Sequence, residues 1–387
     1  MSGFGVDESY LLSVLQSLIS IESTNPSLVE WGCGESKIAR QIGDYLDRIG
    51  LEVDYQEIDE GRENVIGVLR GDGTGRTLML NGHTDTVSIT GMDIQPLEPV
   101  LRDGKVYGRG AFDMKGSLAA MLAAAKELVS SNARLNGDVV FAFVADEEYA
   151  SVGTEEVIKE YSTDAAIVTE PTGLQVIIAH RGYAWAKVEV RGKAAHGSLF
   201  DVGVDAIIKA GKVLVALDEL EGKLKTQNRH PLLGRPSVHA SLIQGGTELS
   251  TYPDYCRIEL ERRTLPDEDY HTIEAELNKL VSDIASSDRQ FDASSEVFFY
   301  RPGLEISEDT EIVNHLTSAC QAVTGTRPEL IGARWWTDAA LLSRAGIPAV
   351  LFGPSGDGAH SPVEFVDFES LRTTAQILAE VVSSFCG

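Results

Sequence analysis

Several short segments of the sequence carry histidine or acidic side chains directly after a stretch with the pattern of a β-strand. The first is Gly82-His83-Thr84-Asp85, which follows an apolar run that ends at Asn81. Side chains two residues apart in an extended segment share a face, so Asp85 could orient the His83 imidazole and raise its basicity as a metal ligand. A histidine and a carboxylate at a strand end can equally form a structural pair, and this segment alone leaves both interpretations open.

Two further segments place carboxylates where a metal ion or a catalytic base would need them. Asp113 lies in a glycine-rich loop, residues 108–116, just before an alanine-rich helix, where it could bind a metal or simply cap the helix. Asp146-Glu147-Glu148 directly follows an apolar strand pattern. Clustered acids there repel one another unless a cation neutralises them, although a solvated loop is the alternative. Of the two glutamates, one could bind metal and the other act as a base.

Glu170 and His360 occupy the same kind of position. Glu170 follows the strand pattern at residues 165–168, and His360 follows the one at residues 349–352. Open α/β sheets build their binding sites beyond the carboxyl ends of their strands. Independent surface loops would not repeat this placement, so we expect all these side chains to meet at one site.

The elements that must position these residues alternate between helix and strand patterns, which is typical of an α/β fold. In the first half, helices are predicted at residues 9–19, 35–49, 116–130 and 153–160, and strands at residues 64–70, 76–81, 138–144 and 165–168. Near Gly182 the pattern changes to alternating strands, at residues 183–190, 237–244 and 255–263, with helices at residues 204–220 and 268–286. After Val297 the α/β pattern resumes, with helices at residues 309–324 and 338–345, a strand at residues 349–352 and a closing helix from Phe368. We therefore expect an α/β catalytic domain formed by residues 1–181 and 298–387, with a second domain, residues 182–297, inserted into it.

The composition limits the possible partners. The 387 residues carry a formal net charge of −26, from 33 basic and 59 acidic side chains. Such a surface repels phosphate backbones and anionic lipids, so we expect neither nucleic acid nor a membrane as a partner, and an anionic substrate would need a local basic patch. No segment approaches the ~20 apolar residues that span a bilayer. The scattered cysteines favour reduced thiols in the cytoplasm over a disulfide framework or cysteine-bound zinc, and they are Cys33, Cys256, Cys320 and Cys386.

Taken together, these segments match the motifs of a known family in identity, order and spacing. Over nearly its whole length the chain resembles the metallopeptidases that include aminoacylase, acetylornithine deacetylase, succinyl-diaminopimelate desuccinylase and glutamate carboxypeptidase. The resemblance implies a zinc-peptidase-like catalytic domain, in which helices flank a central mixed sheet. It also implies that the inserted α+β domain serves as a lid and joins two copies into a homodimer.

The resemblance further implies a site with two Zn²⁺ ions, for which Co²⁺ or Mn²⁺ could substitute. Asp113 would bridge the two ions. His83 and Glu170 would complete one ligand set, and Glu148 and His360 would complete the other.

Glu147 would then be the general base. The two ions would share a water and lower its pKa, while Glu147, free of metal, takes the proton and delivers it to the departing amine. Asp85 would support His83 in this arrangement, and the peptide bond between Asp113 and Met114 would be cis.

In the inserted domain, two residues match functional positions of the family. His196 corresponds to a lid histidine that stabilises the oxyanion, from the same chain or from a dimer partner, although a lone histidine is often structural. Arg263 corresponds to an arginine that grips the substrate carboxylate, with a surface salt bridge as the alternative. Ser250 stands where many relatives have asparagine and Glu261 where aspartate is common, so carboxylate binding could differ here.

Arg334-Trp335-Trp336-Thr337-Asp338-Ala339 departs from the family more strongly. The Thr-Asp-Ala part matches, and we assign Asp338 to the substrate-binding set, but the two preceding residues are usually small. We hypothesise that Trp335 or Trp336 lines the substrate pocket, with core packing as the alternative.

The predicted activity is hydrolysis of the amide bond of an N-acyl amino acid, of the deacetylase or desuccinylase type, or of a small peptide by a carboxypeptidase. A dipeptidase or aminopeptidase of the same family is the alternative, and a non-catalytic binding protein on the same fold is the competing class. Residues 71–77 suggest a phosphate loop only superficially, because they precede a strand and lack the required spacing and lysine. The sequence contains no Gly-x-Ser-x-Gly motif that would indicate a serine hydrolase.

Overall fold

The computed structural model describes residues 4–227 and 229–387, which divide into two compact units. The first unit extends to Ile178 and includes Ile306–Ile331 and Thr337–Gly387. The second unit consists of Ala179–Glu305 and Gly332–Trp336. It is therefore wider than the predicted insertion at residues 182–297, and it takes in a second, short piece of the chain that the sequence pattern had assigned to the first unit.

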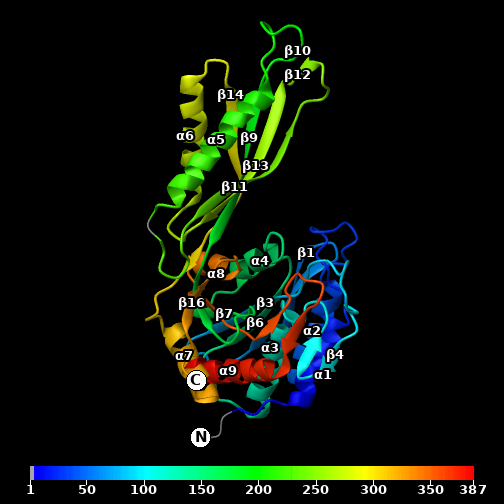
Figure 1. The fold of residues 1–387 in the computed structure, drawn as a ribbon. Coiled ribbons are helices and arrows are strands. Elements are labelled where there is room, and N and C mark those ends of the chain that lie inside the picture. The colour runs from blue at the N-terminus through cyan, green and yellow to red at the C-terminus, as the bar shows by residue number, and fades with distance from the viewer. Residues whose placement is uncertain (1–3, 228) are drawn as a thin grey trace. The chain divides into compact units, whose positions relative to one another are not determined.

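A mixed sheet forms the centre of the first unit (Figure 1). Its strands follow the order β1 (Glu52–Asp59), β2 (Arg62–Leu69), β6 (Val139–Val144), β3 (Leu78–His83), β7 (Ala165–Val168), β17 (Ala349–Leu351) and β8 (Val176–His180), and β15 (Leu304–Glu305) and β16 (Leu330–Ala333) add short pairings to β8. β3 pairs in parallel with both β6 and β7, and β17 pairs in parallel with β7. The carboxyl ends of these four strands consequently lie at one edge of the sheet. The predicted α/β class with a central mixed sheet is confirmed.

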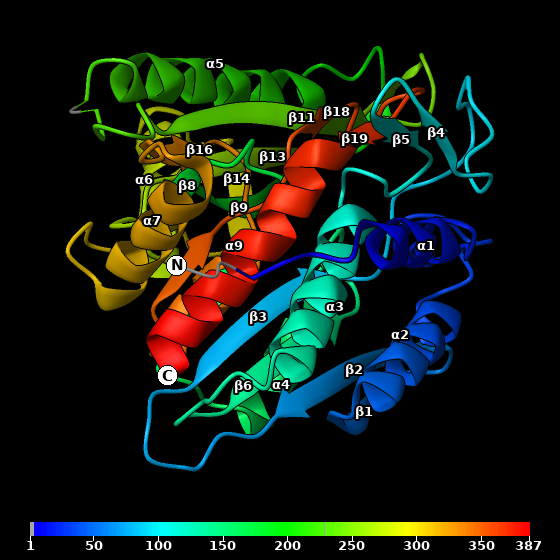
Figure 2. The same cartoon turned by 90° about the horizontal axis from the view of Figure 1, so that it is seen from below.

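Helices cover the sheet of the first unit in two layers. One layer holds α1 (Glu8–Ile19), α2 (Ser36–Ile49), α3 (Lys115–Ser130), α7 (Glu311–Thr324) and α9 (Phe368–Cys386), and in Figure 2 β3 is visible between α9 and α3. α4 (Val152–Glu160) and α8 (Ala339–Arg344) pack together on the other face. The alanines of α3 are buried, and their small side chains let α3 and α9 approach closely. The predicted helices are present, with ends shifted by a few residues.

A small antiparallel sheet was not predicted. It consists of β4 (Val100–Arg102), β5 (Lys105–Tyr107), β19 (Phe365–Asp367) and β18 (Gly356–Asp357). β5 pairs with β19 across more than half of the chain, so the loop after β5 and the loop between β18 and β19 are held side by side. Strands of two or three residues leave no periodic pattern that a sequence reading could detect.

The second unit is an antiparallel sheet covered on one face by two helices. The strand order is β11 (Ser237–Gly245), β13 (Tyr255–Thr264), β9 (Gly182–Arg191) and β14 (Asp292–Arg301), and the helices are α5 (Ala206–Leu224) and α6 (Tyr270–Ser287). Alternate residues of β9 are buried, which is the period expected of a strand with one covered face. A two-residue pair, β10 (Ala195–His196) with β12 (Thr251–Tyr252), lies outside this sheet.

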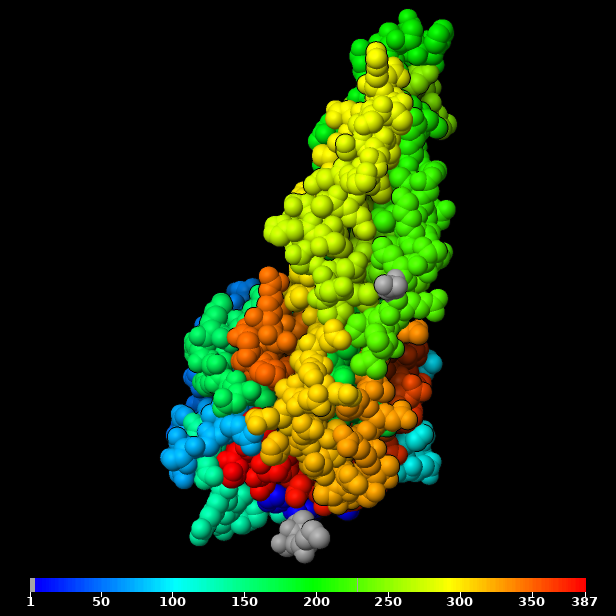
Figure 3. Space-filling view, turned by 90° about the vertical axis from the view of Figure 1, so that its left-hand side faces the viewer, coloured from blue at the N-terminus to red at the C-terminus, as the bar shows by residue number. Residues whose placement is uncertain are grey.

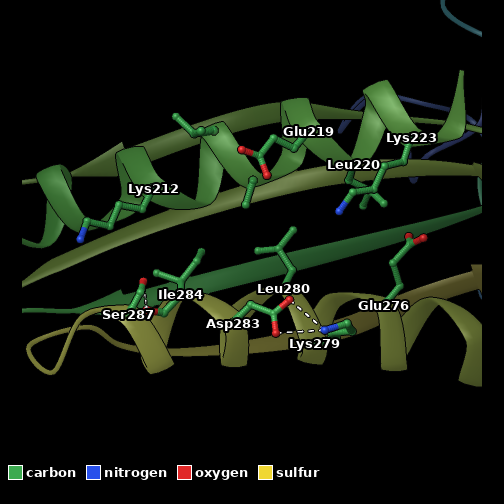
Figure 4. Close-up of a pocket in the computed structure, with 12 residues that line it drawn as sticks. Lys212, Glu219, Leu220, Lys223, Glu276, Lys279, Leu280, Asp283, Ile284 and Ser287 are labelled. Carbon is green, nitrogen blue, oxygen red and sulfur yellow. Dashed lines mark hydrogen bonds and ion pairs between the residues drawn. The ribbon is translucent and has the colours of Figure 1, made fainter.

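A groove of about 350 Å³ runs between α5 and α6 (Figure 4). Apolar side chains such as Leu220 and Leu280 form its floor, and charged side chains, including the Lys279–Asp283 ion pair, form its rim. The space-filling view shows the yellow surface of α6 beside the green surface of α5 (Figure 3). The groove contains none of the residues predicted to carry chemistry.

None of the described helices combines the length and the apolar character needed to cross a bilayer. All four cysteines are free thiols.

Candidate active site

The predicted metal ligands meet at the carboxyl edge of the central sheet. His83, Asp113 and Glu170 form one group of possible ligands, and Asp113, Glu148 and His360 form a second, with the ligand atoms of each group within 4.8 Å of one another. His83 ends β3, while Glu148 and Glu170 follow the neighbouring strands β6 and β7. Asp113 and His360 come from the two loops that the small sheet holds together. The sequence therefore identified side chains that the fold brings into one cluster.

Asp113 faces both groups at once. One of its carboxylate oxygens, Oδ1, lies 3.1 Å from His83 Nε2, and the other, Oδ2, lies 3.3 Å from His360 Nε2. His83 Nε2 is also 3.9 Å from Glu170 Oε1, and His360 Nε2 is 3.0 Å from Glu148 Oε2. Imidazole nitrogens and carboxylate oxygens at such separations fit a pair of divalent cations bridged by one aspartate, and this ligand set suits zinc.

The environment of His83 leaves one ring nitrogen for metal. Nδ1 lies 2.9 Å from the backbone carbonyl oxygen of Asp85, to which it donates when it carries the proton, and 3.5 Å from the Asp85 carboxylate. This contact selects the tautomer in which Nε2 is free to coordinate. Asp85 thus orients the imidazole, but mainly through its main chain.

The Asp85 carboxylate has a second task that the sequence did not suggest. It accepts hydrogen bonds from the backbone N–H groups of Glu147 and Glu148, both at 3.2 Å, and from the Asn25 side chain at 2.7 Å. Burial alone would raise the pKa of Asp85, and hydrogen bonds from His83 and Asn25 bring it below its ordinary value. Asp85 remains ionised and positions the turn that carries both glutamates.

A buried ion-pair network supports the turn that carries Glu147 and Glu148. Arg62 donates to Glu35 through Nε at 2.9 Å, and its Nη2 lies 2.8 Å from Asp146 Oδ1. Asn25 donates to Asp146 as well, at 3.1 Å. The sequence marks Asp146 only as part of an acidic run, and it does not predict the other members of the network because they are far apart along the chain.

Glu364 holds the loop that carries Asp113. Its buried carboxylate accepts hydrogen bonds from the backbone N–H groups of Gly110, Phe112 and Asp113, at 2.9 to 3.0 Å, and pairs with Arg109 at 2.7 Å. Gly110 has a φ of 77°, which glycine adopts without strain. The Asp113–Met114 peptide is cis, as the resemblance implied. The sequence did not predict this bracing role of Glu364.

Glu147 belongs to neither ligand group. Burial raises the pKa of its carboxyl group well above the ordinary value, and the negative charge of Glu170 raises it further. Cations held by the neighbouring ligands would oppose these effects. A carboxyl group that lies beside the metal-binding side chains but is not itself a ligand is free to take up and release a proton during catalysis.

Asp338 is buried beneath the same region of the first unit. It accepts a hydrogen bond from Thr154 at 2.6 Å and is only 1% exposed. Burial raises its pKa to about 6. Contact between Asp338 and the substrate stays a prediction, since the contact described here is a hydrogen bond inside the first unit.

The remaining predicted residues belong to the second unit. His196 is exposed, and its Nδ1 lies 2.8 Å from the Ser198 hydroxyl oxygen. The residue after it, Gly197, donates its backbone N–H to the backbone carbonyl of Ser250. Arg263 donates to Glu261 at 2.7 Å and lies over the Tyr183 ring. The salt bridge considered as the alternative for Arg263 is therefore present, and carboxylate binding by Arg263 stays a prediction.

The two tryptophans differ in their surroundings. Trp336 donates through its indole N–H to the backbone carbonyl of Pro302 at 2.9 Å and makes edge-on contacts with His180 and Tyr183. Trp335 is half exposed. Within the second unit, Trp336 thus has a packing role, while Trp335 offers an open aromatic face.

Two ligand groups that share an aspartate, with a further glutamate beside them at the carboxyl edge of an α/β sheet, define a dinuclear-metal hydrolase. Comparison with known proteins identifies the family of hydrolases to which the chain belongs. The model of peptidase family M20/M25/M40 matches residues 79–384, so the chain belongs to this family of metallopeptidases and amidohydrolases. The resemblance stated from the sequence is confirmed, as is the prediction of an amide-hydrolysing enzyme.

Relatives with established names match along almost the entire chain. Acetylornithine deacetylase of Myxococcus xanthus is 30% identical over 391 residues, which cover 97% of this chain and 98% of the relative. N-formyl-4-amino-5-aminomethyl-2-methylpyrimidine deformylase of Bacillus subtilis strain 168 is 28% identical over 408 residues, which cover 97% of this chain and 94% of the relative.

Solved structures show the same fold. A tripeptidase from Staphylococcus aureus superposes with a TM-score of 0.80 at 21% identity, covering 98% of this chain and 99% of the other. A dinuclear metal-binding peptidase of the M20 family from Bacillus subtilis superposes with a TM-score of 0.76 at 18% identity, covering 98% of both chains.

Proposed function

We propose that this protein is a two-zinc deacylase that hydrolyses the amide bond of a small N-acylated amine, with an N-acyl amino acid as the substrate class. The observation that carries the proposal is the placement of Glu147 beside, and outside, two ligand groups that share Asp113. The two relatives described by name, a deacetylase and a deformylase, both remove a small acyl group from nitrogen. They support the reaction type for this chain.

In the proposed mechanism the ligand residues hold the ions and the other residues handle the proton. When bound, two zinc ions lower the pKa of a water and polarise the scissile carbonyl group. Glu147 accepts the proton from the attacking water and passes it to the nitrogen of the leaving amine. Asp85 keeps the Glu147 turn in place through the backbone bonds described above, and Glu364 keeps the Asp113 loop in place.

We propose that residues of the second unit, together with Asp338 of the first unit, bind the rest of the substrate. His196 would donate to the oxyanion, and no described residue occupies its Nε2 with a hydrogen bond. Arg263, Ser250, Asp338 and a tryptophan at position 335 or 336 complete the proposed binding set.

A peptidase of the same family is the second candidate. Its support is the fold of the tripeptidase, and at 21% identity that likeness extends to the fold alone. The two candidates differ in one requirement, since an aminopeptidase or dipeptidase needs a free amino terminus in its substrate. A panel of N-acetyl, N-formyl, N-succinyl and N-carbamoyl amino acids together with dipeptides distinguishes them.

The decisive experiment compares Glu147→Gln with the wild-type enzyme on the best substrate of this panel. We expect kcat to fall by a factor of roughly 10² to 10⁴, the usual contribution of a general base, while the zinc content of the purified protein is unchanged. Metal content is the control, because it separates loss of the base from loss of the site. Equal activity of the two proteins would overturn the mechanism and favour a binding protein on the same fold.

We also propose that two copies associate through the second unit. β11 forms one edge of the four-stranded sheet, and its Leu242 and Ile243 side chains are 57% and 52% exposed. An exposed apolar edge strand is a template for pairing with another strand. Light scattering should give the mass of a dimer for the wild type and of a monomer for Leu242→Lys, and a monomeric wild type would refute the proposal.

The free thiols support a cytoplasmic location, where cysteines stay reduced.

A further inference from the structure

Four arginines surround a hollow in the second unit. The hollow has a volume of about 530 Å³ and is lined by Arg181, Arg229, Arg235 and Arg334, with Leu232 and Ser237 among the other lining residues. It shares no residue with the metal-binding groups or with the predicted substrate-binding set. In a chain whose 59 acidic residues outnumber its 33 basic ones, this concentration of arginine requires an explanation.

Most of this positive charge is not neutralised by the protein. Arg235 pairs with Glu221 at 2.7 Å. Across residues 4–227 and 229–387, no ion pair joins Arg181, Arg229 or Arg334 to a carboxylate. Four guanidinium charges less the one carboxylate leave a formal charge of +3 around the hollow.

The arginines repel one another. Burial lowers the pKa of Arg181 below its ordinary value, and the charges of Arg334 and Arg235 lower it further. An arrangement of like charges that the protein itself leaves uncompensated is stabilised by binding a negatively charged ligand.

The loop that carries two of the arginines is held in a fixed shape. His230 and Gly234 exchange backbone hydrogen bonds, and His230 Nε2 lies 2.9 Å from Glu305. Arg181, which lies between β8 and β9, donates to the backbone carbonyl of Leu233 through Nε at 3.2 Å and so ties that connection to this loop. These hydrogen bonds fix the backbone around the hollow, so binding requires little rearrangement of the backbone.

We propose that this arginine-lined hollow binds a small multivalent oxyanion, an organic phosphate, diphosphate or polycarboxylate with two or more negative charges. Guanidinium groups bind phosphate and carboxylate oxygens through paired N–H donors, and several arginines can serve one ligand from different sides. The volume lies within the range of small-molecule sites. The strongly acidic remainder of the surface disfavours an extended polyanion such as nucleic acid, so the ligand is a small molecule.

Calorimetric titration of the zinc-loaded full-length protein tests this proposal. The probes are inorganic phosphate, pyrophosphate and tricarballylate, a tricarboxylate that chelates metals weakly, all at constant ionic strength. We expect pyrophosphate or tricarballylate to bind the wild type, and the stronger of the two identifies the ligand as a phosphate or a carboxylate. In Arg229→Gln/Arg334→Gln the dissociation constant should rise at least tenfold.

Arg289→Gln is the matched control, because Arg289 is an exposed arginine of the same unit outside the hollow. It should bind the probe as the wild type does. If the double variant unfolds at a lower temperature than the wild type, the single variant Arg334→Gln is used in its place, with a smaller expected loss. Absence of binding to the wild type at millimolar probe, or equal affinity of the wild type and the folded arginine variants, would overturn the proposal.

Discussion

Neighbouring carboxylates acquire different roles from their surroundings. Glu148 lies 3.0 Å from His360 and joins a ligand group, whereas the adjacent Glu147 joins none. Both depend on Asp85, which accepts the backbone N–H of each. The residue that sets this geometry therefore contributes no atom to either ligand group.

Asp85→Asn tests that dependence. The backbone carbonyl that contacts His83 is retained, but the carboxamide presents an N–H₂ group where the carboxylate accepted hydrogen bonds from Asn25 and from the turn. We expect activity or zinc affinity to fall roughly 10- to 100-fold, the usual effect of losing a residue that supports a ligand. Steady-state kinetics and competition with a zinc chelator measure the two quantities, and Asp47→Asn on the exposed face of α2 is the control. Wild-type values for Asp85→Asn would show that the turn keeps its position without the negative charge of Asp85.

At the scale of elements, the small sheet and Glu364 determine where the Asp113 loop lies. β5 and β19 place the loop against the segment that carries Glu364, and three backbone N–H groups donate to that one carboxylate. The pairing of two distant segments, β5 and β19, thus holds Asp113 beside Glu364, the residue that supports its loop. Damage to the support should be visible as a loss of stability.

Glu364→Gln should lower the free energy of unfolding by about 3 to 5 kcal/mol, because it leaves the buried Arg109 guanidinium without its counter-charge. Urea denaturation followed by circular dichroism measures the change. Glu369→Gln provides the matched control: Glu369 pairs with Arg372 at the surface, where such a pair contributes about 0 to 1 kcal/mol. Similar changes for the two variants would contradict the bracing role of Glu364.

The whole molecule combines two units with different electrostatic character. The first gathers acidic groups at a metal site, and the second gathers arginines around a hollow. Because the acidic ligands repel one another, bound cations should stabilise the folded state of the first unit.

Removal of metal with a chelator should therefore abolish activity and lower the melting temperature, and zinc should restore both. At a zinc concentration one hundred times the dissociation constant, each independent site adds about 2.7 kcal/mol to the free energy of unfolding. Calorimetry with and without zinc measures the difference, and Asp113→Asn should show little response, since Asp113 belongs to both ligand groups. A wild-type protein that melts at the same temperature in both conditions would refute the metal site.

The sequence by itself predicted the helices and most strands, and its family resemblance supplied the proposed set of metal ligands. Apolar periodicity is a local property, so α3 and β6 can be recognised from the chain alone. His83, Glu148 and Glu170 could be expected to meet because each ends or follows a strand of one parallel group, whose carboxyl ends lie at one edge of the sheet. Their role as ligands rests on the family resemblance and stays a proposal.

Only the tertiary structure decided which distant groups support that site. Arg109 and Glu364 are 255 residues apart, and Asn25 and Asp146 are 121 apart, so no local pattern could pair them. The same holds for the arginine hollow, whose members come from separate segments of the second unit. Local sequence encodes the periodicity of an element, whereas the partner of a buried charge depends on which segments the chain packs together.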